Sequence, residues 1–149
     1  MRSPRRQRLL IPMLYAWSSD LSLTLWFQPD GYWHGDYSQA DELITPYKTL
    51  LEFHPAAFVA GSLANLTVYA LVALFCPLRI GRAAALFVTV GHMWGASSWI
   101  WMCLPLCGYW IAGLHLIGCA LLTWVWDVPD NAAALQTTAS KNGEMRLVA

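Results

Sequence analysis

Charged side chains are scarce in this chain of 149 residues, and neither sign predominates. Asp, Glu, Lys and Arg together make up 12% of the sequence, and the formal net charge is zero. An ordinary soluble domain carries roughly twice that share of charged residues. Proteins that bind nucleic acid usually show a basic surface, which this composition does not provide. The composition therefore argues against a nucleic-acid partner and against an ordinary soluble enzyme.

The sequence also lacks the short motifs that identify common reactions. It has no Gly-x-Ser-x-Gly segment around a nucleophilic serine. It has no His-x-x-x-His or Glu-x-x-His pair that would place two metal ligands on one helix face. No motif assigns a specific activity, so function has to be inferred from where polar residues fall within apolar segments.

Apolar residues make up 57% of the chain, which includes nine Trp, six Tyr and five Phe. Four stretches are long and apolar enough to cross about 30 Å of hydrocarbon as helices. Short breaks at Pro77–Arg82 and Cys103–Gly108 make the neighbouring helices antiparallel. We therefore predict an all-α integral membrane protein, a four-helix transmembrane bundle in a single domain over residues 9–126. Its spans are residues 9–27, 56–78, 83–102 and 108–126.

The basic residues fall on one side of this predicted topology. That side holds the arginines of residues 1–8, Arg79, Arg82, and the basic residues of the tail, whereas the other side has only Lys48. Because Lys and Arg are retained in cytoplasmic loops, we predict that both termini are cytoplasmic and that the protein lies in an inner or plasma membrane. The polar tail, residues 127–149, is predicted to be disordered.

Residues 28–55 form the predicted outer loop. Thr45-Pro46 is a favourable helix start, and apolar positions follow at helical spacing, which predicts a short helix along the membrane interface. Two interpretations remain open: the loop covers the helix ends, or Glu52 and His54 form the mouth of a pocket. Aromatic residues near this loop are expected at the headgroup level of the lipid bilayer. They are Trp26, Phe27, Tyr32, Trp33 and Tyr37.

Each predicted span carries one strongly polar residue at nearly the same depth. At about 1.5 Å per residue, Asp20, Asn65, His92 and His115 lie roughly 11 to 15 Å from the outer ends of their helices. A charged carboxylate at such a depth costs about 2.5 to 3.5 kcal/mol when it faces lipid. We therefore predict that these side chains converge inside the bundle and bind a hydrophobic or protonatable small molecule.

Other roles for the same residues remain open. An integral-membrane enzyme could use Asp20 with His92 or His115 as acid and base on a lipid-like substrate. The same three residues could hold a metal ion, and the two histidines could bind haem, although the small residues on both helices favour direct helix contact over a porphyrin-sized gap. A structural subunit of a homo-oligomer or a membrane complex would use the cluster only for interhelical hydrogen bonds.

Two cysteines lie in the predicted outer turn. Cys103 and Cys107 are close enough in sequence to form a disulfide in an extracytoplasmic compartment, and two free thiols are the alternative. Cys76 and Cys119 fall within predicted spans, where a thiol behaves as a small apolar group.

Overall fold

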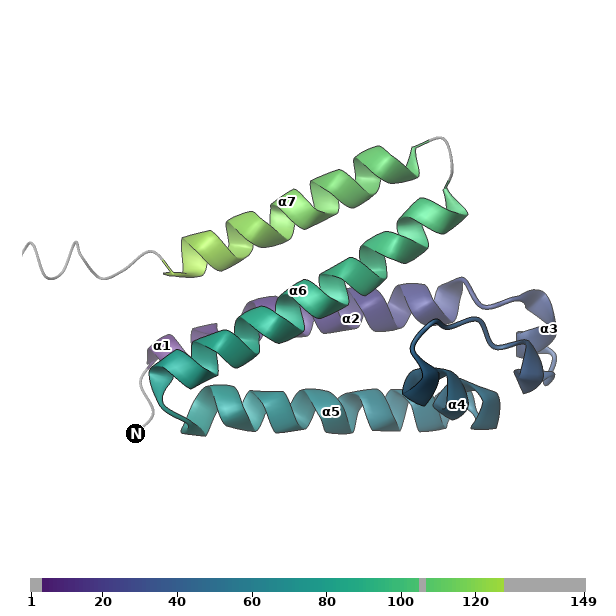
Figure 1. Cartoon of the computed structure of the whole chain (residues 1–149), viewed down its shortest axis with the longest axis horizontal. Helices are drawn as coiled ribbons and strands as arrows, with labels where there is room; N and C mark the ends of the chain where they lie inside the picture. Colours follow the sequence, from purple (N-terminus) through teal and green to yellow (C-terminus); the bar gives the residue numbers. More distant parts are fainter. Residues whose placement is uncertain (1–3, 105–106, 128–149) are drawn as a thin grey trace, which may run out of the picture.

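The computed structural model describes residues 4–104 and 107–127, and every regular element in this part of the chain is a helix (Figure 1). The all-α prediction is therefore confirmed for the described residues. The long helices are α2 (Leu10–Trp26), α5 (Pro55–Phe75), α6 (Leu78–Cys103) and α7 (Gly108–Asp127). The short ones are α1 (Pro4–Arg8), α3 (Asp30–Trp33), the 3₁₀ turn η1 (Tyr37–Gln39) and α4 (Thr45–Phe53). The predicted tail, apart from Asp127, lies outside the described residues.

Helix α6 is the centre of the arrangement, since it packs against α2, α5 and α7. Figure 1 shows α5 and α6 meeting at the turn after Phe75 and diverging towards the opposite end of the molecule, with α7 on the far side of α6. Helices α2 and α5 contact each other much less than either contacts α6. The divergence of α5 and α6 leaves space that other residues must line, and the candidate site lies there.

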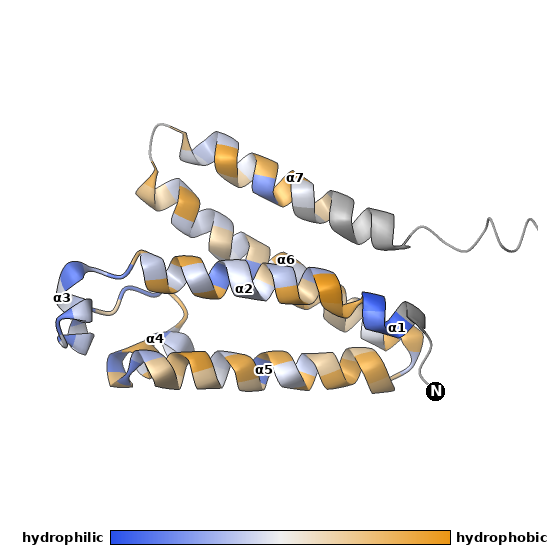
Figure 2. Ribbon diagram, turned by 180° about the vertical axis from the view of Figure 1, so that it is seen from behind, coloured by the Kyte–Doolittle hydropathy of each residue, from blue (hydrophilic) through white to orange (hydrophobic). Residues whose placement is uncertain are grey.

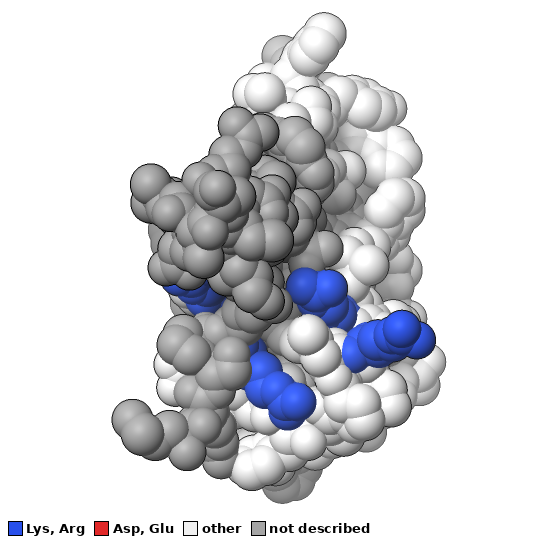
Figure 3. Space-filling view, turned by 90° about the vertical axis from the view of Figure 1, so that its left-hand side faces the viewer, with Lys and Arg blue, Asp and Glu red and all other residues white. Residues whose placement is uncertain are grey.

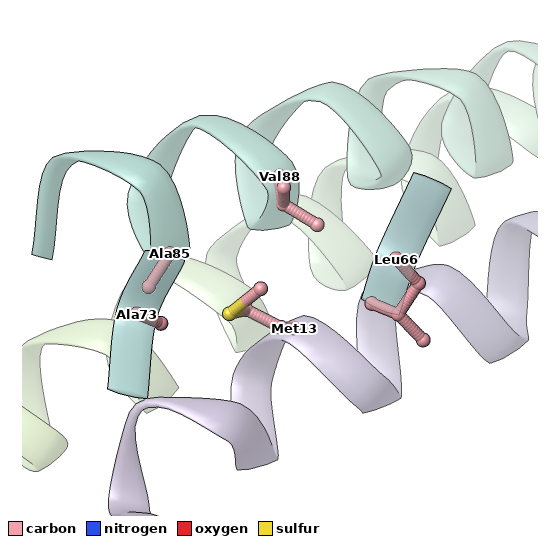
Figure 4. Close-up of a cluster of buried hydrophobic side chains, with 5 residues drawn as sticks. All are labelled: Met13, Leu66, Ala73, Ala85 and Val88. Carbon is pink, nitrogen blue, oxygen red and sulfur yellow. The ribbon is translucent and has the colours of Figure 1, made fainter. Parts of the chain in front are cut away.

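A tight apolar core holds α2, α5 and α6 together where α5 and α6 are closest (Figure 4). Met13 of α2 lies between small residues of the other two helices and is fully buried. A Cβ on Gly81 would lie 2.7 Å from the carbonyl oxygen of Ala73, so this glycine allows the two backbones to approach. The cluster comprises Met13, Leu66, Ala73, Ala85 and Val88.

The expectation that Pro77–Arg82 would form a loop is wrong, because α6 begins at Leu78. Pro77 is the N-cap, with an extended ψ of 143°, and its carbonyl oxygen accepts a hydrogen bond from the amide of Gly81. Proline is well suited to the start of a helix, and Gly81 acts as a contact residue at this position. Arg79 and Arg82 therefore extend from the first turns of a helix.

The two ends of the helical body differ in chemistry. Figure 2 shows hydrophilic residues concentrated in α1 and around α3, with largely hydrophobic helices between them. We name the end formed by α1 and the α5–α6 turn the basic end. There, Lys and Arg side chains gather and no acidic side chain is visible on the described surface (Figure 3). We name the opposite end, residues 27–54, the loop end; it includes α3, η1 and α4.

One helix in the described part of the chain, α5, is both long enough and apolar enough to cross a membrane by length and composition. Core helices of soluble proteins can pass the same test, but only 22% of the apolar window of α5 is buried. Helix α2 has 17 residues, which is near the lower limit of length for a membrane span. In residues 4–104 and 107–127, one helix thus meets the length and composition of a membrane span, and every regular element is a helix.

The loop end has a small apolar core of its own. Tyr32 is fully buried against Ala40, Leu51 and Phe58, and its hydroxyl donates a 3.3 Å hydrogen bond to the carbonyl oxygen of Leu51. The ring of Tyr32 is therefore enclosed by other residues of the loop end, and its level relative to a bilayer stays a prediction. The predicted short helix is present as α4, which starts at Thr45 with Ile44 as its N-cap.

Candidate functional site

A cavity of about 500 Å³ lies between α2, α5 and α6. Residues 41–44 and Tyr47 of α4 cover it from the loop end. Its volume falls within the range of small-molecule binding sites, which is roughly 300 to 1,000 Å³. Its polar groups include Asp20, Asn65 and His92, so three of the four predicted polar residues line one space.

Asp20 and His92 form a close pair across α2 and α6. Oδ2 of Asp20 lies 2.7 Å from Nδ1 of His92, and the two side chains are 20% and 17% exposed. An ionised carboxylate only accepts hydrogen bonds, so Nδ1 carries a proton whenever Asp20 is charged. The other ring nitrogen, Nε2, then remains available to a ligand.

Gly95 makes room for this pair. A Cβ at position 95 would lie 2.5 Å from Oδ1 of Asp20 and 2.9 Å from its Cγ, which is too close for real atoms. One turn earlier on α6, a Cβ on Gly91 would meet nothing within 4 Å, and Gly91 lines the cavity. The two glycines thus have different roles, since one accommodates the carboxylate and the other leaves the cavity open.

Two further hydrogen bonds fix α5 against its neighbours. Nδ2 of Asn65 donates to the hydroxyl of Tyr47 at 2.7 Å, which connects α5 to α4. Nε1 of Trp17 donates to Oγ of Ser62 at 2.8 Å, which connects α2 to α5. Asn65, Ser62 and Tyr47 all line the cavity, so the bonds that hold the helices also set the positions of its polar groups.

Gln28 holds the cover of the cavity in place. Its side chain is almost fully buried, and Nε2 donates to the carbonyl oxygens of Thr24, at 2.8 Å, and Asp41, at 2.9 Å. Its Oε1 accepts the amide of Asp41 at 2.9 Å. This pair of reciprocal bonds joins residue 41 to the end of α2 and so positions the acidic residues that follow.

Glu42 is a partly buried acid at the edge of the cavity. Burial raises the pKa of its carboxyl group, and the nearby charges of Asp20 and Asp41 raise it further. Backbone hydrogen bonds oppose this shift, chiefly the amide of Ile44, which donates to Oε1 at 2.9 Å. Burial also raises the pKa of Tyr47, against the opposing effect of its hydrogen bond with Asn65.

The structure places the remaining predicted residues elsewhere. His115 of α7 stacks on Tyr15, with ring centroids 6.0 Å apart, and does not line the cavity. Glu52 is exposed and lies outside the cavity lining. Nδ1 of His54 accepts the amide of Ala56 at 3.1 Å and thereby caps α5. The structure therefore does not bring Glu52, His54 or His115 to the cavity with Asp20.

The described residues include no group of three or more His, Cys, Asp and Glu residues that could hold a metal ion. The weak metal set of Asp20, His92 and His115 is thus not assembled there, because His115 lies against Tyr15. His92 lines the cavity and His115 does not, which disfavours a haem held between these two histidines. Cys103 and Cys107 are free thiols in the structure, which corresponds to the second of the two alternatives.

Sequence reasoning missed four residues that shape the site: Gln28, Asp41, Glu42 and Tyr47. Asp41 and Glu42 lie in a polar segment between two helices, which by itself indicates only exposure to water. Tyr47 falls among the helically spaced apolar positions that follow Thr45-Pro46, although a buried tyrosine hydroxyl usually has a hydrogen-bond partner. That requirement was the one signal that could have paired Tyr47 with a polar residue of a neighbouring helix.

Comparisons with known proteins assign no family to this chain. No protein-family model matches it, and neither a curated protein nor a solved structure does so significantly. The function of the cavity is therefore argued from its geometry and chemistry.

Proposed function

We propose that this chain is a four-span membrane protein that binds a hydrophobic or amphipathic small molecule in the cavity between α2, α5 and α6. One observation carries the proposal: an apolar space of about 500 Å³ contains a few convergent polar groups, among them the Asp20–His92 pair. Cavities of this composition are the usual form of a small-molecule site.

Exposed apolar surface supports the membrane part of the proposal. Large hydrophobic side chains face outward along all four long helices, which is more than monomeric soluble proteins usually expose. Helix α5, with 21 residues, is roughly 32 Å long and matches the hydrocarbon thickness. Representative exposed residues are Leu14, Leu71, Val90 and Leu114.

The charge distribution supports the orientation. The basic end carries arginine side chains (Figure 3). Five of the nine Asp and Glu residues of the chain fall in the loop end, residues 27–54. Because basic residues are retained in the cytoplasm, the basic end and both termini lie on the cytoplasmic side.

Cysteine labelling tests this orientation. In a variant with its native cysteines replaced by alanine, an impermeant maleimide added to intact cells should label Ser38→Cys. Gln7→Cys should react only after permeabilisation. Labelling of both from one side would contradict the topology.

The edge of the cavity supports entry from the membrane. Leu43 and Trp94 line the cavity and are 82% and 70% exposed, so its margin is apolar and reaches the surface of the helical body. In the proposed orientation this margin faces the outer half of the bilayer. An apolar ligand can then move from lipid to cavity without crossing water.

A pair of glycine substitutions tests the binding function. Gly91→Leu fills the cavity from open space, and Gly113→Leu on α7 is the matched control, because neither glycine has a neighbour within 4 Å of a Cβ. The probe is Nile red, an uncharged dye, added to the protein in lipid nanodiscs, with empty nanodiscs as background. Saturable binding should occur in the wild type and in Gly113→Leu and disappear in Gly91→Leu. Equal binding in all three proteins would reject the cavity as the binding site.

The Asp20–His92 geometry favours one second candidate, an integral-membrane enzyme that acts on a lipid-like substrate. Asp20 fixes Nδ1 of His92, so Nε2 can exchange a proton with a substrate in the cavity. Total membrane lipid incubated with the protein is the substrate probe. Lipid products that form with the wild type but not with His92→Gln, while Nile red binding persists, would favour the enzyme.

A further inference from the structure

The charged groups that line the cavity are mostly acidic. Asp20, Asp41 and Glu42 contribute three carboxyl groups, His92 contributes one imidazole, and no Lys or Arg lies among the described lining residues. With all three acids ionised, the lining stays negative even when His92 is protonated. Apart from His92, which pairs with Asp20, no basic side chain among the described lining residues offsets these carboxyl groups.

Aromatic rings form much of the remaining wall. Six of them line the cavity, from α4, α5 and α6: Tyr47, Phe58, Tyr69, Phe87, Trp94 and Trp99. The faces of such rings attract cations, and the attraction is strongest where water is excluded. Aromatic walls beside carboxylates suit a cation whose charge is surrounded by apolar groups, because both parts of the ligand then meet a complementary surface.

We propose that the cavity selects a monovalent lipophilic organic cation, such as a substituted ammonium or phosphonium ion, which enters from the outer half of the membrane. This inference rests on the proposed function, since it requires that the cavity binds a small molecule. The positive centre lies near Asp20 and Glu42, and the substituents lie against the aromatic wall.

Other ligand classes fit the lining less well. An inorganic metal ion needs several converging ligands, and the described residues contain no such group. An anion would meet three carboxyl groups without a basic partner. A neutral apolar molecule can still bind through the apolar wall, but it displaces water from the carboxyl groups without supplying a charge, so it should bind more weakly than a cation of the same size.

Two ions of the same shape and opposite charge test the selection by charge. The probes are radiolabelled tetraphenylphosphonium and tetraphenylborate, each equilibrated with wild-type protein in phosphatidylcholine nanodiscs and corrected for uptake by empty nanodiscs. We expect saturable binding of the cation that is at least about tenfold tighter than that of the anion, since desolvated cation–aromatic contacts alone are of that size.

Amide substitutions test the role of the carboxyl groups. Glu42→Gln and Asp20→Asn keep the side-chain size and remove one negative charge each. Each should weaken cation binding by about fivefold to tenfold, which corresponds to one screened charge–charge attraction of about 1 kcal/mol. Asp30→Asn is the matched control, because Asp30 is exposed on α3 and does not line the cavity. It should leave binding unchanged. Circular dichroism of each variant confirms that the helices have formed.

The outcomes separate the two proposals. Equal binding of both ions, or cation binding that neither amide variant weakens, would overturn selection of a cation. If Gly91→Leu still abolished the binding of these ions, the proposed ligand-binding function would stand. Binding of either ion that Gly91→Leu does not affect would place it outside the cavity and overturn the proposed function as well. Both proposals are supported if the preference for the cation is lost in Glu42→Gln and Gly91→Leu. The same preference should be retained in the control variants Asp30→Asn and Gly113→Leu.

Discussion

Two glycines one turn apart on α6 should respond in opposite ways to the same substitution. Alanine in place of a helical glycine stabilises a protein by about 0.5 to 1 kcal/mol when the new methyl group has space. Gly91 has that space, since nothing lies within 4 Å of a Cβ there. Gly91→Ala should therefore raise the free energy of unfolding by about that amount.

Gly95→Ala should lower it. The new Cβ would lie 2.5 Å from Oδ1 of Asp20, and the carboxylate would have to leave a position in which it bonds to His92 at 2.7 Å. Loss of a hydrogen bond to a charged group costs about 1.5 to 3 kcal/mol, which exceeds the gain in helix propensity. The gain in helix propensity is common to both variants, so their free energies of unfolding should differ by the lost bond alone, about 1.5 to 3 kcal/mol.

Unfolding of the purified protein in mixed micelles by dodecyl sulfate, followed by circular dichroism, measures both values. In an Asp20→Ala background the opposing carboxylate is gone, so Gly95→Ala should become as favourable as Gly91→Ala. Double-mutant cycles isolate such pairwise effects between residues in contact. Equal stabilisation by Gly91→Ala and Gly95→Ala in the wild-type background would refute the packing of Asp20 against Gly95.

Three further substitutions test the site and its frame. The pKa of Glu42 is raised, so this carboxyl group binds its proton more tightly in the folded protein than in the unfolded one. The free energy of unfolding should therefore fall as pH rises from the pKa of the unfolded state to the higher pKa of the folded state. Thermal melts from acid to neutral pH should show this fall in the wild type but not in Glu42→Gln. Gln28→Met should cost about 1 to 3 kcal/mol, because it replaces the buried Gln28 amide and leaves the backbone amide and carbonyl of Asp41 without that partner. Hydrogen exchange at the amide of Asp41 should then accelerate. Arg6→Gln removes the 2.8 Å bond from Nη1 to the carbonyl oxygen of Leu74 near the end of α5 and should cost about 0.5 to 1 kcal/mol in dodecyl sulfate unfolding.

The helices follow from the sequence more directly than the site does. Long apolar runs predict α2, α5, α6 and α7 to within a few residues, apart from the start of α6, where Gly81 is a packing residue for Ala73. Depth along a helix is additive, so it correctly places Asp20 and His92 at one level, and their pairing follows. Depth says nothing about rotation around the helix axis, and His115 consequently faces Tyr15 on another side of the bundle.

Contacts from the loop end could not be predicted in this way. Gln28 reaches residue 41 through a turn that includes Gly35, whose positive φ of 98° reverses the chain in a manner that apolar periodicity does not encode. Glu42 consequently covers the cavity although its position in the sequence suggests only an exposed loop. A segment with low hydropathy can thus supply a site residue once a single buried amide fixes its path.

The pairing of the polar groups argues for a binding role over a purely structural one. Asp20, Asn65 and Glu42 each have a hydrogen-bond partner within the protein. A carboxylate has about four acceptor positions, however, and these bonds use only part of that capacity. Side chains that served only to join helices would be expected to interlock without a void, whereas these surround about 500 Å³ of space. Filling that space through Gly91→Leu should therefore leave the helices intact and remove only the binding, which separates the two roles in one variant.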